Sequence, residues 1–298
     1  MRVALVNYTY GGASGSGRHV QLLHKGLRRE DVEAIAIHRG NSWELRLPRL
    51  KSLTFSVGAS LRVRGFDLVH VHSPKLLPSL TLADRGVVTV HGGEAEFREK
   101  YGAISDAFWL GMRALRGRIG AITTVMKYEA ERKGWTWIPN MTDLEAIEEV
   151  EPAKESLVLF VGRNDPVKNY RLFKGVVSAL KVKHVAFGVE RVAPWKEVIS
   201  YMKSAVCLMI TSSWEGMPSV MLEAWASECP VIANRIPAFQ PYSDALLLTD
   251  STLHGWVEAF SKLEEVKDRV IRRGREIVED LDYKRVTKRY LDLYYALA

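Results

Sequence analysis

The feature that most constrains the fold is a regular alternation of short apolar runs with segments of helical spacing. Apolar runs of strand type are followed by segments such as 17–29, where apolar residues recur every three or four positions. The alternation predicts an α/β fold of two Rossmann-like, doubly wound parallel sheets facing a cleft. The runs span residues 2–8, 32–39, 66–73, 86–92, 118–125, 157–163, 183–189, 206–212, 229–235 and 245–250.

Length and charge divide the chain into two parts. Its 298 residues are enough for two domains, and the acidic stretch 143–156 interrupts the pattern and is the predicted linker. Residues 1–140 hold 21 basic and 12 acidic side chains, a net charge of +9, whereas residues 141–298 hold 21 and 23, a net charge of −2. The basic part is compatible with nucleic acid, an anionic membrane or phosphorylated substrates as partners, or with an ordinary solvated surface.

The cysteines, the first residues and the Gln and Arg content indicate the cellular compartment and the source of the protein. Cys207 and Cys229 lack CxxC spacing and have apolar neighbours, so we expect inert core residues and neither a disulfide framework nor a zinc site. The first residues read as a strand, without a secretory segment, which predicts a cytoplasmic protein. Only two Gln occur in the chain while Arg is abundant, a bias that indicates a thermophilic source.

Two segments that follow predicted strands are suited to bind an anion. Gly12 and Gly15 belong to a glycine-rich turn after the first strand, where the backbone and the next helix start can approach a ligand, although such turns are often only turns. Arg163 and Lys168 flank an Asp-Pro turn in the second half, so that both cations can fold back on one anion or simply lie in solvent.

The segment Ser212–Ala233 combines a loop Glu, a Pro that suits a helix start and a second Glu inside the helix. Glu215 is suited to sugar hydroxyls, and Glu223, flanked by apolar residues, needs partners because a partly buried carboxylate is costly. The backbone N–H groups at the helix start favour an anion. The free N–H groups at this helix start are those of Met217 and Ser219.

Histidines follow two further strands. His91 ends the fourth apolar run and is the best placed to reach a reacting group. His70 and His72 form an HxH pattern, which can indicate a metal, but no third ligand is evident nearby in the sequence. We therefore predict no metal site.

Taken together, these segments resemble the family 4 group of retaining GT-B glycosyltransferases. EGMPSVMLE is similar to its E-x7-E element, GRNDPVK to its GR-x4-K element, and SGSGRHVQLLHKGL to its glycine loop and helix. FDLVHVHS, VVTVHG and IPN occur in the expected order, so the resemblance covers nearly the whole chain. It implies domains at 1–143 and 144–280, with helix 281–298 crossing back to the first. One departure is Asn169, where the family usually has Gly.

The resemblance also implies roles for the candidate residues. Arg163 and Lys168 would bind the diphosphate of a nucleotide sugar, such as a UDP- or GDP-sugar, as catalytic groups. Glu215 would hold sugar hydroxyls, Glu223 the ribose diol, and His91 would donate to the transferred sugar. The backbone of Gly216, Met217 and Ser219 would lie beside the sugar. Gly15, or failing it Gly12, would contact the pyrophosphate.

The implied reaction is metal-independent transfer of a hexosyl unit, with retention, to a sugar or lipid-linked acceptor. The basic, partly apolar stretch 46–65 either rests on a membrane or forms an ordinary amphipathic helix. Two other functions stay open: a nucleotide-sugar epimerase or hydrolase, and a nucleic-acid-binding or -modifying protein that uses the basic half. Since no nucleic-acid-binding module is recognisable, we expect no nucleic acid partner.

Overall fold

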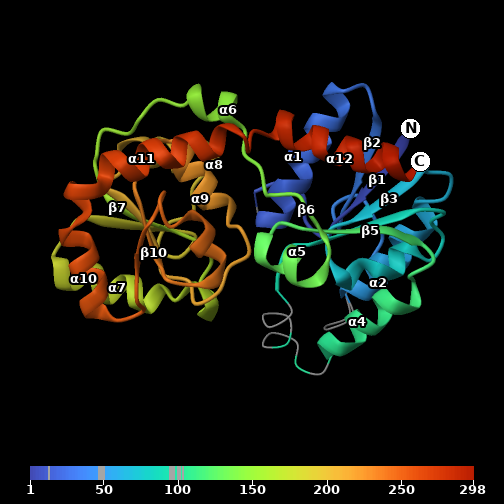
Figure 1. Cartoon of the computed structure of the whole chain (residues 1–298), viewed down its shortest axis with the longest axis horizontal. Helices are drawn as coiled ribbons and strands as arrows, with labels where there is room; N and C mark the ends of the chain where they lie inside the picture. Colours follow the sequence, from blue (N-terminus) through green and yellow to red (C-terminus); the bar gives the residue numbers. More distant parts are fainter. Residues whose placement is uncertain (13, 46–50, 94–97, 99–101, 103) are drawn as a thin grey trace. The chain divides into compact units, whose positions relative to one another are not determined.

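The computed structural model describes residues 1–12, 14–45, 51–93, 98, 102 and 104–298. The chain forms two compact units: Met1–Met141 with Tyr283–Ala298 make unit 1, and Thr142–Asp282 make unit 2. Each unit is a parallel sheet with helices on both faces (Figure 1). The predicted α/β class with two doubly wound parallel sheets is therefore confirmed.

Unit 1 contains a six-stranded sheet in the order β2-β1-β3-β4-β5-β6, in which every neighbouring pair is parallel. Successive side chains of a strand point to opposite faces, and β1 accordingly sends alternate residues into two separate cores. The strands are β1 (Arg2–Val6), β2 (Glu33–Ile37), β3 (Leu68–Val71), β4 (Gly86–Val90), β5 (Ile119–Thr124) and β6 (Thr136–Trp137).

Helices on the two faces of this sheet close the two cores. Val3 and Leu5 of β1 pack with apolar residues of the first and last helices, and Ala4 and Val6 pack with Phe55 and its neighbours on the other face. The helices of unit 1 are α1 (Gly15–Arg29), α2 (Lys51–Arg62), the 3-10 helix η1 (Pro74–Leu80), α4 (Ile104–Ala114), α5 (Lys127–Lys133) and α12 (Tyr283–Leu297).

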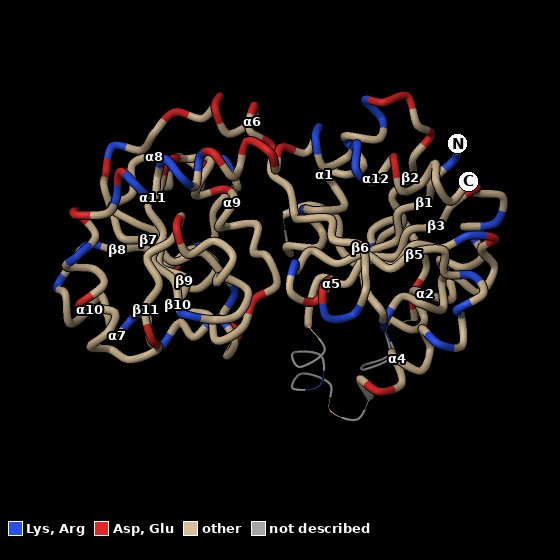
Figure 2. Tube along the Cα trace, in the orientation of Figure 1, with Lys and Arg blue, Asp and Glu red and all other residues tan. Residues whose placement is uncertain are grey.

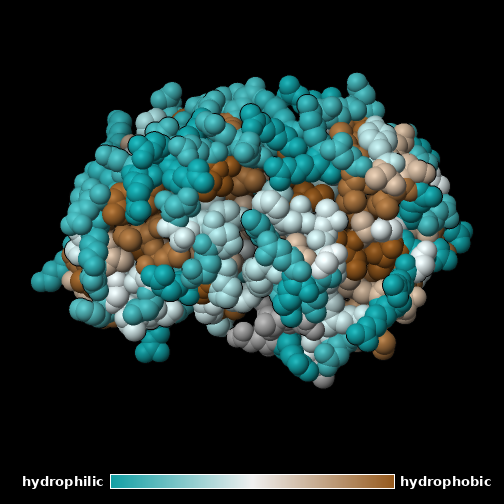
Figure 3. Space-filling view, viewed as in Figure 1, coloured by the Kyte–Doolittle hydropathy of each residue, from teal (hydrophilic) through white to brown (hydrophobic). Residues whose placement is uncertain are grey.

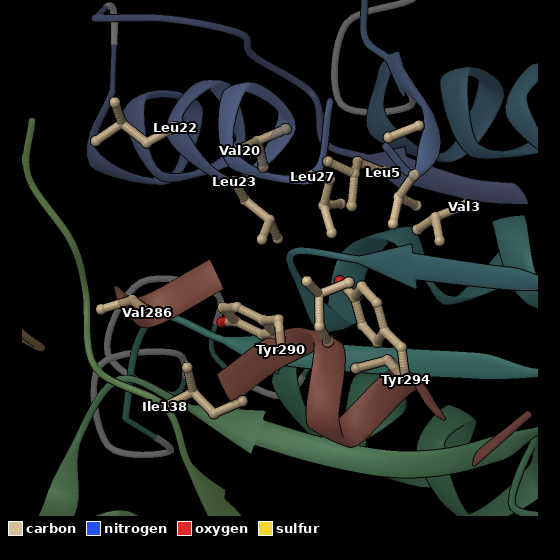
Figure 4. Close-up of a cluster of buried hydrophobic side chains, with 14 of the residues drawn as sticks. Val3, Leu5, Val20, Leu22, Leu23, Leu27, Ile138, Val286, Tyr290 and Tyr294 are labelled. Atoms are coloured by element: carbon tan, nitrogen blue, oxygen red, sulfur yellow. The ribbon is translucent and has the colours of Figure 1, made fainter. Parts of the chain in front are cut away.

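The last helix, α12, is part of the core of unit 1. Figure 4 shows Tyr290 and Tyr294 among the apolar side chains of α1 and β1, with Ile138 below them. The two helices approach closely at Gly26, where a Cβ atom would fall 2.0 Å from Oγ1 of Thr287. A side chain larger than hydrogen at position 26 would therefore push α12 away from α1.

Unit 2 contains a five-stranded parallel sheet in the order β11-β10-β9-β7-β8. Its strands are β7 (Val158–Val161), β8 (His184–Phe187), β9 (Cys207–Ile210), β10 (Val231–Asn234) and β11 (Leu247–Thr249). Its helices are α6 (Leu144–Glu148), η2 (Pro166–Lys168), α7 (Tyr170–Leu180), α8 (Trp195–Ser204), α9 (Ser219–Ala226), η3 (Pro237–Tyr242), α10 (Leu253–Ser261) and α11 (Leu263–Glu279).

The predicted linker 143–156 is partly wrong, because its first part is the helix α6. Asp143 caps this helix by accepting from the backbone N–H of Ala146 at 3.2 Å. Asp282, which lies in a DLD sequence that reads as solvated surface, is instead buried and accepts from the N–H of Leu144 at 3.2 Å. Asp143 of the acidic stretch, together with the distant Asp282, thus accepts from the first N–H groups of a short helix that the hydrophobic pattern does not reveal.

The charged residues lie mainly on helices and loops, while the strands are almost free of them (Figure 2). In the view of Figure 3 the surface is mostly hydrophilic, with separate apolar patches. None of the helices in the described part of the chain combines the length and the apolar composition of a membrane-spanning helix.

Candidate active site

Each of the two sheets has its own topological switch point. In unit 1, β1 lies between β2 and β3, and in unit 2, β7 lies between β8 and β9, so the chain leaves the central strand in one direction and returns on the other side. Ligands of doubly wound sheets bind outside the carboxyl ends of the strands at such a point. The segments that follow these strands are residues 7–17 and His72 in unit 1, and residues 162–169 and 211–218 in unit 2.

The strongest feature at the switch point of unit 2 is an ion pair between Lys168 and Glu215. Nζ of Lys168 lies 2.6 Å from Oε1 of Glu215, and Oγ of Ser212 donates to the same oxygen at 2.7 Å. Glu215 is 8% exposed, so its charge is held by these contacts in a largely water-poor setting. The structure thus brings together one predicted cation and one predicted acid from different loops.

The loops that carry Lys168 and Glu215 are held together by hydrogen bonds to their backbone carbonyl groups. Oγ1 of Thr211 donates to the carbonyl oxygens of Lys168 at 2.9 Å and of Asn169 at 3.1 Å, and the N–H of Ser213 donates to that of Val167 at 2.9 Å. From β10, the side-chain amide of Asn234 donates to the carbonyls of Thr211 and Ser212. The positions of Lys168 and Glu215 are therefore fixed by the fold and not only by their mutual attraction.

Asn169 explains a departure from the family pattern. Its φ is +49°, in the left-handed region that favours Gly and that Asn tolerates better than most other residues. Its side chain also accepts from the N–H of Leu172 at 3.3 Å and so caps α7. Asn therefore keeps the turn after Lys168 and adds a helix cap that Gly lacks.

Arg163 follows β7 directly and extends into solvent. Its side chain is 67% exposed, and its guanidinium lies 3.9 Å from the carboxylate of Asp165, a long and weak contact. Asp165 in turn accepts from the N–H of Val167 at 3.1 Å and starts η2. Arg163 and Lys168 thus stand on either side of one tight turn, as their spacing predicts.

The carboxylate of Glu223 accepts a hydrogen bond from an indole. Nε1 of Trp195, at the start of α8, donates to Oε1 of Glu223 at 2.8 Å, and the carboxylate is 8% exposed. A solvated helix-surface Glu is thereby ruled out for this position. Trp195 was not predicted, because the indole comes from a distant helix and no local pattern marks it.

The start of α9 differs slightly from expectation. Pro218 is the residue before the helix, with extended backbone (φ −69°, ψ 129°), and Ser219 is the first helical residue. Gly216 and Met217 are buried in the loop that leads to it, and Sδ of Met217 is 3.8 Å from the hydroxyl of Tyr242. Gly216, Met217 and Ser219 thus follow Glu215 in the loop and at the helix start, and they are the residues whose backbone was predicted to contact the ligand.

The glycine-rich turn of unit 1 is tightly closed by two other glycines. Gly11 has φ +82° and donates to the carbonyl of Gly17 at 3.0 Å, and a Cβ at Gly17 would lie 2.6 Å from the carbonyl oxygen of Gly11. Ser14 caps α1 by accepting from the N–H of Gly17 at 3.0 Å. Gly12 and Gly15, the predicted ligand contacts, are both exposed on this turn.

His91 belongs to a cluster of four imidazoles in unit 1. It is half-buried after β4, and its Nε2 lies 3.5 Å from Nδ1 of His72, which follows β3. The ring of His19, from α1, packs edge-on against His91 with ring centres 4.8 Å apart. The ring of His70, inside β3, lies at a tilt beside that of His72, with ring centres 4.0 Å apart.

Hydrogen bonds fix the inner members of the cluster. Nδ1 of His19 is 2.9 Å from Oδ1 of Asn140 and its Nε2 is 3.1 Å from the hydroxyl of Tyr290, so both ring nitrogens are engaged. The ring of His70 is bonded in the same way to Tyr294 of α12 and to Thr89, each at 2.6 Å. The last helix therefore reaches beneath the candidate site and sets the orientation of two imidazoles.

Burial keeps these histidines neutral. It lowers the pKa of His19 to about 4, against which the hydrogen bond to Asn140 acts weakly. It also lowers the pKa of His70, His72 and His91 well below the ordinary value, and neighbouring imidazoles act in the same direction. At neutral pH His91 is therefore a neutral donor or acceptor and not a cation.

One member of the HxH pattern, His72, lies close to two histidines that are distant from it in the sequence. His19, His72 and His91 present nitrogens that all lie within 4.8 Å of one another. Both nitrogens of His19 already have partners in Asn140 and Tyr290, which favours a hydrogen-bonded network over a ligand set. The sequence could not reveal this group because its members come from α1 and from the segments that follow β3 and β4.

Comparison with known proteins relates the chain to a family of enzymes and to a fold. Residues 122–265, just under half of the chain, match the family model described as Glycosyl transferases group 1. No curated protein sequence gives a significant match.

Solved structures match over the whole chain. A sucrose-phosphate synthase from Thermosynechococcus elongatus is 16% identical with a TM-score of 0.76, covering 100% of this chain and 99% of the other. HepE of Anabaena in complex with UDP-glucose is 11% identical with a TM-score of 0.75, and 100% of each chain is covered. The catalytic domain of starch synthase IV from Arabidopsis thaliana, bound to ADP and acarbose, is 10% identical with a TM-score of 0.73 and 99% coverage of both chains.

At these identities the structural likeness establishes the fold alone, and the sequence match concerns mainly unit 2. The whole-chain fold and the match over residues 122–265 together support a group 1 glycosyltransferase on a GT-B fold.

Proposed function

We propose that the protein transfers a hexosyl unit from a nucleotide-diphosphate sugar to a sugar or lipid-linked acceptor, with retention of configuration. The observation that carries the proposal is the ion pair of Lys168 and Glu215 at the switch point of unit 2, with Arg163 on the other side of the same turn. Cations suit a diphosphate, and a carboxylate held in place can accept hydrogen bonds from sugar hydroxyls. Unit 2 supplies both from two loops that are fastened together.

In this mechanism the bond between the anomeric carbon and the diphosphate oxygen breaks first. Arg163 and Lys168 stabilise the negative charge that grows on the leaving diphosphate. The acceptor oxygen attacks the same face of the sugar, and its proton passes to the departing phosphate oxygen. No carboxylate nucleophile is then required, and Glu215 serves to hold hydroxyls of the transferred sugar.

The remaining residues have binding roles. Glu223 holds the ribose diol, and its hydrogen bond from Trp195 keeps the carboxylate in one orientation. The backbone of Gly216, Met217 and Ser219 lies beside the sugar. From unit 1, Gly15 or Gly12 contacts the pyrophosphate.

His91 donates a hydrogen bond to the transferred sugar. The low pKa values in its cluster support this role, because a neutral imidazole can donate without adding charge. We also propose a reaction without a metal ion, as the family resemblance implies. We further propose a cytoplasmic location, and a thermophilic source on the scarcity of Gln and the abundance of Arg.

The test is to supply UDP- and GDP-sugars with and without candidate acceptors and to measure nucleoside diphosphate release. A transferase releases it only with an acceptor, and NMR of the product then reports the anomeric configuration. Release without any acceptor would favour the hydrolase alternative, and a changed sugar without release would favour the epimerase. Salt-sensitive binding of DNA or RNA, with no donor turnover, would favour a nucleic-acid protein.

A further inference from the structure

Unit 1 presents an unpartnered apolar face on α2. Leu53, Val57 and Leu61 are each separated by four positions, so they lie along one side of the helix, and they are 49%, 49% and 65% exposed. The opposite side, with Phe55 and Ala59, is buried in the core. The exposed side thus has no apolar function within the described part of unit 1.

The preceding segment widens this face. Trp43 and Leu45 are 60% and 45% exposed. The N–H of Leu45 donates to Oγ1 of Thr54 at 3.2 Å, and a Cβ at Gly58 would lie 2.6 Å from the carbonyl oxygen of Trp43. The segment therefore runs along α2 between positions 54 and 58. We call the five exposed apolar residues Trp43, Leu45, Leu53, Val57 and Leu61 the α2 face.

Most of the exposed large apolar side chains in the described part of the chain lie on the α2 face. Of the nine large apolar side chains that are exposed in the described part of the chain, five belong to the α2 face. An exposed cluster of this kind marks an interaction site more often than chance, whereas single exposed apolar residues need no explanation.

The charge around the face indicates its partner. In the described part of the range from Arg39 to Gly65 there are four basic residues, Arg39, Lys51, Arg62 and Arg64, and one acidic residue, Glu44. Lys51 and Arg64, at the two ends of α2, are exposed. Two copies of this surface would repel each other, whereas anionic lipid headgroups would attract the cations while the apolar side chains enter the interface.

We propose that the α2 face docks unit 1 on an anionic membrane surface. The helix would lie in the plane of the interface, with Leu53, Val57 and Leu61 toward the acyl chains. That the bound membrane carries a lipid-linked acceptor rests on the proposed function. The docking itself does not, since it depends only on exposed apolar and basic side chains.

The experiment is flotation of the full chain with vesicles of phosphatidylcholine alone and of phosphatidylcholine with phosphatidylglycerol. We expect the protein to float with the anionic vesicles. The double substitution Leu53→Ser/Leu61→Ser should reduce the bound fraction by about tenfold or more, because two apolar anchors are lost. Lys51→Glu/Arg64→Glu should reduce binding to the anionic vesicles.

Matched controls come from unit 2. Leu253→Ser removes an exposed leucine of similar exposure (47%), and Arg269→Glu/Arg272→Glu reverses two exposed charges on α11. Both should float like the unchanged protein. Unchanged flotation of Leu53→Ser/Leu61→Ser would overturn the proposal. So would a dimer in sedimentation analysis that this variant dissociates, combined with no vesicle binding.

Nucleotide binding, followed by thermal shift with UDP and GDP, separates the two proposals. If the vesicles bind and no nucleotide does, the membrane proposal stands and the proposed function fails. If nucleotides bind and the vesicles do not, the membrane proposal fails and the proposed function stands.

Discussion

Lys168 and Glu215 are 47 positions apart in the chain, and their side chains meet at 2.6 Å at the switch point of unit 2. The pair lies where two loops are joined by Thr211, Ser213 and Asn234, so it is positioned before any ligand arrives. Preorganised charges of this kind contribute to catalysis because no reorganisation is required during the reaction.

Glu215→Gln tests the role of the carboxylate. The amide keeps the shape and can still accept from Ser212, but it loses the charge that Lys168 faces. We expect kcat/KM to fall by about 100-fold or more, as for removal of one preorganised electrostatic group. The melting temperature should fall by no more than about 5 °C. Unchanged turnover in steady-state kinetics would contradict the assignment of Glu215.

The sequence predicts the loops that carry Lys168 and Glu215 better than it predicts their hydrogen-bond partners. The strand-and-helix alternation predicts both sheets, and the loop residues after β7 and β9 stand out by their charge and by Gly and Pro. Ser212, Trp195 and Asn234 could not be predicted as partners, because their contacts depend on strand order and helix packing.

Asn169 offers a test of local backbone chemistry. Asn169→Gly keeps the left-handed turn and loses the cap on α7, so the free energy of unfolding should change by a few tenths of a kcal/mol, about 0.5 at most. Asn169→Ala loses the cap and strains the turn, and should cost about 2 kcal/mol. Urea unfolding of both variants measures the difference. Equal stabilities would argue against the left-handed conformation.

The histidine cluster predicts acid sensitivity of unit 1. His19 has a pKa of about 4 in the folded state, below its ordinary value of 6.5, so between these values the unfolded chain takes up a proton that the folded one does not. Stability is therefore retained above about pH 6.5 and lost as the pH falls toward 4. From pH 7.5 to pH 5 this single group should cost about 2 kcal/mol.

His19→Gln isolates that contribution. The variant should be less stable than the unchanged protein at pH 7.5, because the bonds to Asn140 and Tyr290 are altered. Its free energy of unfolding should nevertheless fall by about 2 kcal/mol less between pH 7.5 and pH 5. Denaturant unfolding at the two pH values provides the measurement, and an equally steep loss in both proteins would be inconsistent with a buried neutral His19.

The same cluster shows where sequence reasoning stopped. His91 and the HxH pattern are visible as residues that follow strands. The contribution of His19 from α1, of Asn140 after β6 and of Tyr290 from α12 is not, because the three lie up to 271 positions apart. The IPN sequence, which belongs to the family pattern, was the available signal for Asn140.

Glu223 should determine how ribose is distinguished from deoxyribose. The unchanged protein should bind its preferred ribonucleoside diphosphate about tenfold more tightly than the 2′-deoxy form, since a buried carboxylate loses a hydrogen bond with the latter. Glu223→Ala should reduce this ratio to within about twofold. Competition binding measures both, with Glu258→Ala, an exposed residue of α10, as the control. A ratio that stays at its original value in Glu223→Ala would remove the ribose role.

The most direct measurement is calorimetric titration of UDP and GDP into the unchanged protein, Lys168→Ala and Lys262→Ala. Lys262 makes a surface ion pair with Glu258 at 2.6 Å and serves as the matched control. We predict that one nucleotide binds at one site per chain, that Lys168→Ala raises its Kd by about tenfold or more, and that Lys262→Ala does not change it. Binding of neither nucleotide, or equal affinities in all three proteins, would contradict the account.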